Sequence, residues 1–156
     1  MHMLIKIPQY GFQALLQEPP KGAIPQAFSE VIAAKVNAFH RQLPGYAATR
    51  LVALKGLAET WGLDRIFVKD ESTRFNLKAF KVLGGSYAVA RLVSKKLGLR
   101  LEETDYQYLV SDEAHQKIGR MTFAAATDGN HGRGLAWAAQ QLGQEAIIIL
   151  LWIMQG

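Results

Sequence analysis

The stretch NLKAFKVLGG, from Asn76 to Gly85, places two lysines one helical turn apart at the start of an apolar segment. A lysine amine is a nucleophile only in its uncharged form, and a helix start with apolar neighbours disfavours the ammonium. Lys81 has this setting, and its neighbours are Phe80, Val82 and Leu83. We therefore expect Lys81 to form a Schiff base with an aldehyde. Lys78 has a more polar setting and is expected to be a surface charge.

A pair of glycines, Gly84 and Gly85, follows inside the expected helix. Each glycine costs about 1 kcal/mol relative to alanine in a helix interior. We therefore expect something large or flat, or another backbone, to pack against this side of the helix.

The second candidate for chemistry is the glycine-rich segment TDGNHGRG, from Thr127 to Gly134. Ligands of open parallel sheets bind beyond the carboxyl ends of strands, where helix N-termini offer unpaired backbone N–H groups. Such turns are common, so a tight turn with a helix cap explains the spacing as well. Asp128 can likewise be a favourable charge at a helix start. His131 has no partner at metal-ligand spacing, so we expect no metal site.

The elements that must position these residues follow from the spacing of apolar residues and from the turn signals between them. Residues 1–24 contain several prolines and indicate an extended arm. The later elements expected before residue 120 are a helix over 25–43, a helix that Thr49 caps and that runs to Trp61, a strand over 65–69, a helix from its cap Asn76 to Leu97, and another helix within 101–119.

The last part of the chain has the clearest pattern. It predicts a strand over 121–126, a loop over 127–132, a helix over 133–142 that Gly143 ends, and a strand over 146–151. The second strand is a nearly continuous apolar run, which is typical of a strand covered on both faces. The order strand, helix, strand indicates a parallel pair with a right-handed crossover. The expected fold class is α/β, with an open, mostly parallel sheet and flanking helices.

Composition excludes several classes of protein. The 156 residues are 49% hydrophobic and 20% charged, contain no cysteine and carry a net charge of +5. The basic residues are scattered and form no face with interleaved aromatics, so we expect no nucleic-acid partner. The longest apolar run, from Ala146 to Met154, is far shorter than the ~20 residues that span a membrane. We see no signal peptide, and the missing cysteines fit a cytoplasmic protein.

Two blocks of the sequence together carry a resemblance to a known family. ESTRFNLKAFKVLGGSYA (residues 71–88) and MTFAAATDGNHGRGLAWAAQQLG (residues 121–143) resemble the diaminopropionate ammonia-lyases. These are pyridoxal 5'-phosphate enzymes with the tryptophan-synthase β-subunit fold, fold type II. The resemblance extends from about Gly45 to Leu150. It implies that residues 1–85 form an arm and part of the large cofactor domain, that residues 86–151 form part of the small α/β domain, and that the full-length protein is a homodimer.

The resemblance also implies roles for individual residues. Lys81 matches the lysine that holds the cofactor, and Asn130 matches the asparagine that hydrogen-bonds the 3-hydroxyl of its ring. The substrate-binding loop, which takes the substrate carboxylate, comprises Thr127, Asp128, Gly129, Asn130 and His131. Asp128 also matches an acidic residue implicated in moving the α-proton. The implied reaction eliminates ammonia from 2,3-diaminopropionate and ends in pyruvate and a second ammonia.

Parts of the family pattern are missing from these 156 residues. We find no GGG-type loop for the cofactor phosphate, and the family's second catalytic aspartate falls in a later segment. The final WIMQG, from Trp152 to Gly156, resembles a segment found distinctly later in the family. The chain is therefore expected to be incomplete and inactive in this form. Two alternatives remain, a related lyase of the serine/threonine dehydratase type and a non-catalytic remnant of the fold.

Overall fold

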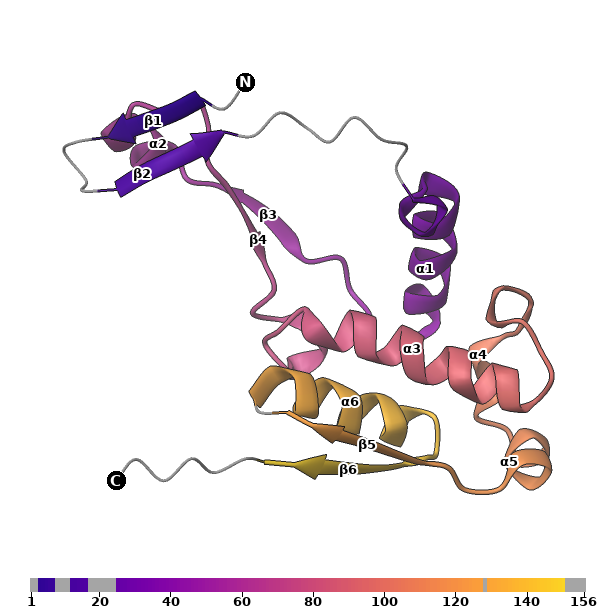
Figure 1. Ribbon diagram of the computed structural model, residues 1–156. Coiled ribbons are helices and arrows are strands. Elements are labelled where there is room, and N and C mark those ends of the chain that lie inside the picture. The colour runs from indigo at the N-terminus through magenta and orange to yellow at the C-terminus, as the bar shows by residue number, and fades with distance from the viewer. Residues whose placement is uncertain (1–2, 8–11, 17–24, 128, 151–156) are drawn as a thin grey trace, which may run out of the picture. The chain divides into compact units, whose positions relative to one another are not determined.

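A computed structural model of the chain describes residues 3–7, 12–16, 25–127 and 129–150 (Figure 1). The chain divides into two compact units, residues 1–32 and residues 33–156. The second unit contains Lys81 and the described residues of the glycine-rich segment.

The first unit contains an antiparallel pair of strands, β1 (Met3–Ile7) and β2 (Phe12–Leu16). Their register joins Met3 to Leu16 and Ile7 to Phe12. The prediction of a plain extended arm over 1–24 is therefore wrong for the described residues. Both strands are short, largely apolar runs, and pairing them satisfies backbone N–H and C=O groups that an isolated arm would leave to water.

The helix expected over 25–43 is confirmed with a later start. A 3-10 turn, η2 (Gln26–Phe28), precedes the α-helix α1 (Glu30–Gln42). Between the two, Ser29 is extended, and its Oγ accepts a hydrogen bond from the backbone N–H of Ile32 at 3.4 Å. This side-chain cap fixes where the α-helix begins.

The second unit contains an antiparallel ribbon of β3 (Arg50–Ala53) and β4 (Phe67–Asp70), with α2 (Lys55–Trp61) between the two strands. The expected strand over 65–69 is confirmed with a small offset, and Gly62 ends α2 with a φ of 64°. The prediction that Thr49 caps α2 is wrong. The apolar run after Thr49 pairs with β4 instead, and the Thr49 hydroxyl donates to Glu71.

The long helix is α3 (Lys81–Lys96), which begins at Lys81 and not at the expected cap Asn76. Asn76 has a φ of 58°, which no residue of a right-handed helix adopts. A 3-10 turn, η3 (Arg74–Asn76), lies before the helix. The single helix expected within 101–119 is instead a 3-10 turn and two short helices, η4 (Leu101–Glu103), α4 (Tyr106–Leu109) and α5 (Asp112–Ile118). The side chains of Asp105 and Ser111 cap α4 and α5 separately.

The strand, helix, strand pattern is confirmed. β5 (Thr122–Ala126) and β6 (Glu145–Ile149) are parallel and flank α6 (Gly129–Gln141). The helix starts inside the expected loop, so the first turn of α6 contains part of the glycine-rich segment. The apolar run of the second strand is typical of a strand covered on both faces, but β6 is not covered in this way in the described part of the chain. β6 pairs with β5 within the described residues, and Ile147 and Ile149 are exposed.

The core lies along α3 and α6, which pack side by side, while the β5–β6 pair lies on the other side of α6 (Figure 1). The buried apolar residues of the core cluster are Phe39, Leu43, Phe75, Val82, Val89, Ala90, Val93, Leu101, Tyr106, Leu109, Ala138 and Leu142. Lys81 is the first residue of α3, and α3 contributes more of the residues of this core than any other helix.

Among the described residues, no helix is long and apolar enough to cross a bilayer.

Candidate active site

Lys81 is the first residue of α3 and is half-buried. Its Nζ lies 5.3 Å from the centroid of the Phe80 ring. The Phe80 side chain is itself 59% exposed, and its ring face lies against the amine. Lys78 precedes the helix and is exposed, as predicted for a surface charge.

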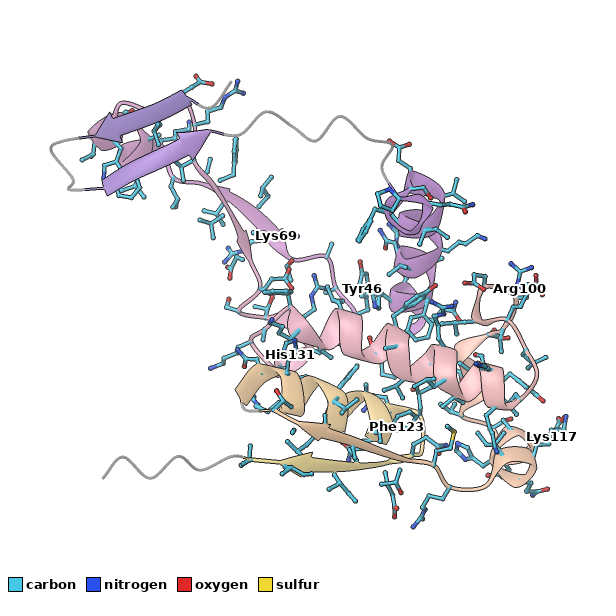
Figure 2. The ribbon with its side chains drawn as sticks, viewed as in Figure 1. Tyr46, Lys69, Arg100, Lys117, Phe123 and His131 are labelled. Carbon is cyan, nitrogen blue, oxygen red and sulfur yellow. The ribbon has the colours of Figure 1, made fainter. Side chains whose placement is uncertain are left out.

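A pocket of about 580 Å³ joins the start of α3 to the end of β5 and the start of α6. It brings together three residues of interest, Lys81, Thr127 and His131; Figure 2 shows His131 near the start of α6. The remaining lining residues are Phe80, Gly84, Gly85, Ala125, Ala126 and Leu135. Asn130 is exposed in the first turn of α6 and is not part of this lining. Asp128 lies outside the described residues.

The glycines around the pocket have separable roles. A Cβ on Gly134 would lie 3.0 Å from the Cα and 3.1 Å from the backbone N of Val82, so α6 touches the backbone of α3 beside Lys81. Gly85 faces the backbone of Gly134 at 3.6 Å across the same crossing. Gly84 has nothing within 4 Å of such a Cβ and lines the pocket. The expectation of another backbone is therefore confirmed at Gly85, while Gly84 faces open space.

A second glycine of the segment, Gly132, allows close packing against the sheet. A Cβ on Gly132 would lie 2.7 Å from Cγ2 of Ile148 on β6, so only glycine lets α6 lie this close to the strand. The backbone N–H of Thr127 donates to the carbonyl of Ile149 at 3.1 Å and extends the ladder between β5 and β6. That N–H is therefore occupied, while the first turn of α6 has N–H groups without partners within the helix.

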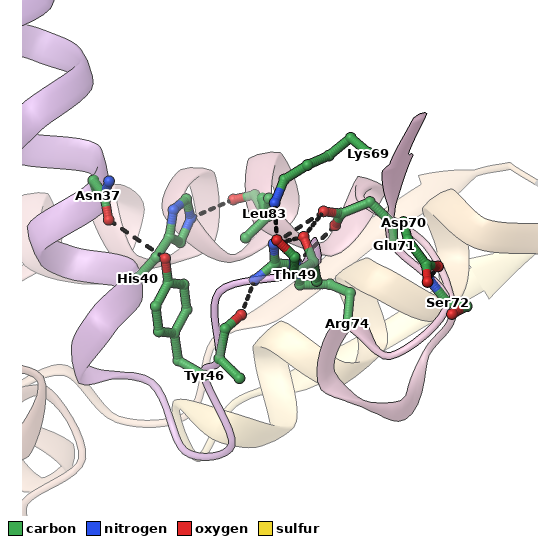
Figure 3. Close-up of polar contacts among 11 residues, drawn as sticks. Asn37, His40, Tyr46, Thr49, Lys69, Asp70, Glu71, Ser72, Arg74 and Leu83 are labelled. Atoms are coloured by element: carbon green, nitrogen blue, oxygen red, sulfur yellow. Dashed lines mark hydrogen bonds and ion pairs between the residues drawn. The ribbon is translucent and has the colours of Figure 1, made fainter. Parts of the chain in front are cut away.

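A buried polar cluster surrounds Arg74, which precedes Lys81 in the chain, and the sequence did not predict this cluster (Figure 3). The Arg74 guanidinium donates to both carboxylate oxygens of Glu71, from Nε at 2.8 Å and from Nη2 at 3.0 Å. It also donates to the carbonyl of Ala47 at 2.8 Å and to the Thr49 hydroxyl at 3.0 Å. Lys69 Nζ donates to the Thr49 carbonyl. The hydrogen bonds from Arg74 hold the pKa of the Glu71 carboxyl below its ordinary value.

The sequence held one signal for this cluster. Glu71 and Arg74 stand three residues apart, the spacing of an ion pair within one turn. Such pairs are common on surfaces, and the sequence did not show that the Arg74 side chain would be only 6% exposed.

His40 of α1 contacts the same end of α3. Its Nε2–H donates to the carbonyl of Leu83 at 2.8 Å, and the residue is buried. Burial lowers the pKa of His40 below its ordinary value. The hydrogen bond from His40 therefore ties α1 to the first turn of α3.

The pocket can be compared with the group that the sequence resemblance implies. Pyridoxal phosphate needs a primary amine for its aldehyde and a flat space for its ring. Lys81 provides the amine, and small residues, Gly84, Ala125 and Ala126, leave the space beside it. These residues fit the aldehyde end of the cofactor. Within the described ranges, no group of three or more histidine, cysteine, aspartate or glutamate side chains is placed to hold a metal ion.

Known proteins resemble the chain in sequence and in structure. The diaminopropionate ammonia-lyase of Escherichia coli strain K12 is 50% identical over 124 residues, which are 79% of this chain and 30% of that protein. The diaminopropionate ammonia-lyase of Salmonella typhimurium strain LT2 is 43% identical over 150 residues, which are 96% of this chain and 36% of that protein. The chain thus spans about a third of the length of the curated relatives it matches.

The structural comparison agrees with the sequence comparison. The crystal structure of the Escherichia coli diaminopropionate ammonia-lyase in complex with D-serine matches with a TM-score of 0.75 and 48% identity, covering 83% of this chain and 32% of that one. The apo form of the same enzyme matches with a TM-score of 0.74. The profile of a family described as pyridoxal-phosphate dependent enzyme matches residues 42–151. The chain therefore belongs to the family of pyridoxal-phosphate-dependent enzymes.

Proposed function

We propose that the chain contains the cofactor-lysine part of a lyase that converts 2,3-diaminopropionate to pyruvate and ammonia. The observation that carries this proposal is the pocket that joins Lys81 to Thr127 and His131. The likeness to ammonia-lyases of known substrate supports it. Bound pyridoxal phosphate supplies an aldehyde that takes up amines and a ring that accepts the electron pair left when the α-proton departs.

Lys81 has the first role in this proposal. Its Nζ is the amine at the pocket, and it must lose a proton before it can bind an aldehyde carbon. The neighbouring Gly84 leaves room beside this amine for a planar ring. Asn130 is assigned the hydrogen bond to the 3-hydroxyl of that ring, on the strength of its place in the matched segment.

The start of α6 has the second role. The backbone N–H groups of Gly129, Asn130 and His131 lie in the first turn of the helix, where donors have no partner within the helix. These groups and the positive end of the helix dipole suit a carboxylate, so we assign them the substrate's carboxylate. Thr127 contributes from the end of β5, where it lines the pocket.

Asp128 is assigned the proton on the α-carbon of the substrate. A carboxylate at this place can accept a proton, and it also favours a substrate with a cationic β-amino group over one with a neutral hydroxyl. This assignment rests on the matched segment, because Asp128 lies outside the described residues.

The setting of the protein is part of the same proposal. We infer a homodimeric full-length enzyme of amino acid metabolism that works in the cytoplasm, without nucleic acid or membrane as a partner. The division into residues 1–85 of the arm and large domain and residues 86–151 of the small domain stays a prediction, as does the origin of Trp152–Gly156, which lie outside the described residues.

A chimera tests the proposal. The 124 residues of the Escherichia coli enzyme that match this chain are replaced by those of this chain, and pyruvate release from both enantiomers of 2,3-diaminopropionate is measured with pyridoxal phosphate present. We expect release by the chimera and none above background by its Lys81→Ala variant.

The other outcomes separate the alternatives. A folded chimera that releases a keto acid only from serine or threonine would replace the proposal with a dehydratase. A folded chimera that is inactive on all of these amino acids would indicate a remnant without catalytic function. We expect the 156 residues by themselves to release no pyruvate, because they contain no GGG-type loop for the cofactor phosphate.

A further inference from the structure

The segment before Lys81 has an unusual backbone. Phe75, Asn76 and Lys78 have φ values of 46°, 58° and 56°, and these are all the non-glycine residues with positive φ in the described part of the chain. Left-handed conformations are costly for side chains other than glycine, asparagine and aspartate. Such residues persist only where their surroundings hold them in place, and they gather at functional sites. We refer to residues 75–78 as the left-handed turn.

Packing holds the first residue of the left-handed turn. Phe75 is 8% exposed, and the centroid of its ring lies 4.6 Å from that of Trp137 on α6. The ring centroid of Tyr46 lies 6.3 Å from that of Phe75. A change of the Phe75 backbone to a negative φ would therefore move its ring and leave a cavity in the core.

Arg74, the residue before the left-handed turn, restrains the turn through its side-chain contacts. Its guanidinium lies 5.9 Å from the ring centroid of Phe75 and 5.6 Å from that of Tyr46. Its hydrogen bonds to Glu71, Thr49 and Ala47 join residues 71–74 to the distant residues 47–49. A planar, multidentate donor of this kind fixes direction as well as distance.

The left-handed turn leads directly into α3. The backbone N–H of Leu77 donates to the carbonyl of Arg74 at 2.8 Å, and the N–H of Leu83 donates to the carbonyl of Phe80 at 3.0 Å. Between these two bonds, Ala79 is buried. The backbone of Lys81 and Val82 then meets Gly134, as described above. The start of α3 is thus held by the turn on one side and by α6 on another.

We propose that the left-handed turn, clamped by Arg74, is a positioning device that sets where the Lys81 side chain leaves the backbone at the pocket. The proposal rests on the proposed function only in taking the Lys81 amine as the group to be positioned. Asn76 offers a cap for a longer helix, yet the chain bends in a costly conformation and starts the helix at Lys81. A segment that only connected β4 to α3 could adopt an ordinary backbone conformation without this cost in free energy.

A matched pair of variants at Lys78 tests the device. Lys78 has a positive φ and an exposed side chain, so its replacement changes the backbone preference and little of the packing. Lys78→Gly favours the left-handed conformation, and Lys78→Val opposes it. Both variants remove the same charge, so each is the other's control. Lys78→Ala is measured beside them as a milder change, in case the valine variant does not fold.

The first readout is hydrogen exchange of the Leu83 amide in protein without cofactor, compared with the Val93 amide on the same helix. We expect Lys78→Val to speed exchange at Leu83 about tenfold and to leave Val93 unchanged, with Lys78→Ala between the two. Lys78→Gly should keep or increase the protection. Equal exchange at Leu83 in the valine and glycine variants would overturn the proposal.

The second readout is the chemical behaviour of Lys81. Each variant is made in the chimera described above and treated with pyridoxal phosphate and a mild reducing agent, and peptide mass spectrometry measures the labelling of Lys81 relative to the exposed Lys95. We expect this ratio to fall several-fold in Lys78→Val and to be kept in Lys78→Gly. Unchanged ratios in all variants would show that the turn does not position the amine. Failure of the chimera with its Lys78 unchanged to label Lys81 above Lys95 would count against the proposed function, while the exchange at Leu83 would still decide the role of the turn.

Discussion

The crossing of α3 and α6 and the ribbon of β3 and β4 differ in how completely they are packed. At the crossing, Gly134 brings two backbones into contact, and Val82 and Ala138 are each 1% exposed. On the ribbon, Leu51 is 65% exposed and Phe67 is 52% exposed. Lys81 stands at the crossing, and the ribbon carries none of the residues assigned to the pocket.

This difference shows where the protein can hold a reactive group. A side chain that must meet a ligand in one geometry needs a backbone that cannot shift, and contact between glycine and backbone on a neighbouring helix provides that. The ribbon has two strands with exposed apolar side chains, so its surface can change with little effect on the start of α3. Substitutions at the two places should therefore differ in their cost, and the following variants test this.

The largest difference is expected between two arginines. Arg74→Met leaves the Glu71 carboxylate and the Thr49 hydroxyl without their buried partner, so the free energy of unfolding should fall by about 3–5 kcal/mol. Arg50→Met on the ribbon breaks an ion pair with Asp70 whose arginine side chain is 80% exposed, and should cost at most about 1 kcal/mol. Urea unfolding measures both values. Equal losses in the two variants would contradict the difference between the buried Arg74 at the approach to α3 and the exposed Arg50 of the ribbon.

A smaller effect is expected from two glycines close in space. Gly134→Ala places a methyl group 3.0 Å from the Cα of Val82, so the two helices must separate, at a cost of roughly 1–3 kcal/mol. Gly84→Ala meets nothing within 4 Å and should raise the free energy of unfolding by up to about 1 kcal/mol, since alanine favours the helix. A stabilising Gly134→Ala would show that the helices do not depend on this contact.

The smallest expected effect is the pH dependence of stability that comes from His40. Burial lowers the pKa of His40, so the unfolded chain takes up a proton near pH 6.5 while the folded chain does not. The contribution of His40 to the free energy of unfolding is complete above pH 6.5 and is lost progressively as the pH falls below that value. His40→Gln keeps a donor for Leu83 and removes the titration, so its stability should depend less on pH over this range. Parallel pH dependence of the two proteins, measured by thermal unfolding, would exclude this role.

The sequence predicted the parts of the molecule that rest on local pattern. Strand, helix and strand near the C-terminus followed from apolar spacing, whereas the role of Lys81, inferred from its apolar neighbours, stays a prediction. The left-handed turn could not be predicted in this way. Its positive φ values depend on the burial of Phe75 and on the partners of Arg74, which come from distant segments. Asn76 therefore resembled a helix cap, although the helix begins later.

The same limit applies to the glycine-rich segment. Its spacing suggested a ligand loop, and two of its glycines in fact allow close packing. Gly132 lies against β6, and Gly134 lies against α3. A sequence shows that a Cβ is missing at these positions, but not which neighbour would meet it. The Thr49 prediction failed for a related reason, since the pairing of β3 with β4 outweighed the local signal for a cap.

The central claim is that Lys81 is the amine that binds the aldehyde of the cofactor. The most direct test incubates the chimera described above with pyridoxal phosphate, reduces the linkage with borohydride and maps the labelled peptides by mass spectrometry. We expect the label on Lys81, the lysine that lines the pocket. A label mainly on Lys78 or Lys69, with Lys81 unmodified, would contradict the account.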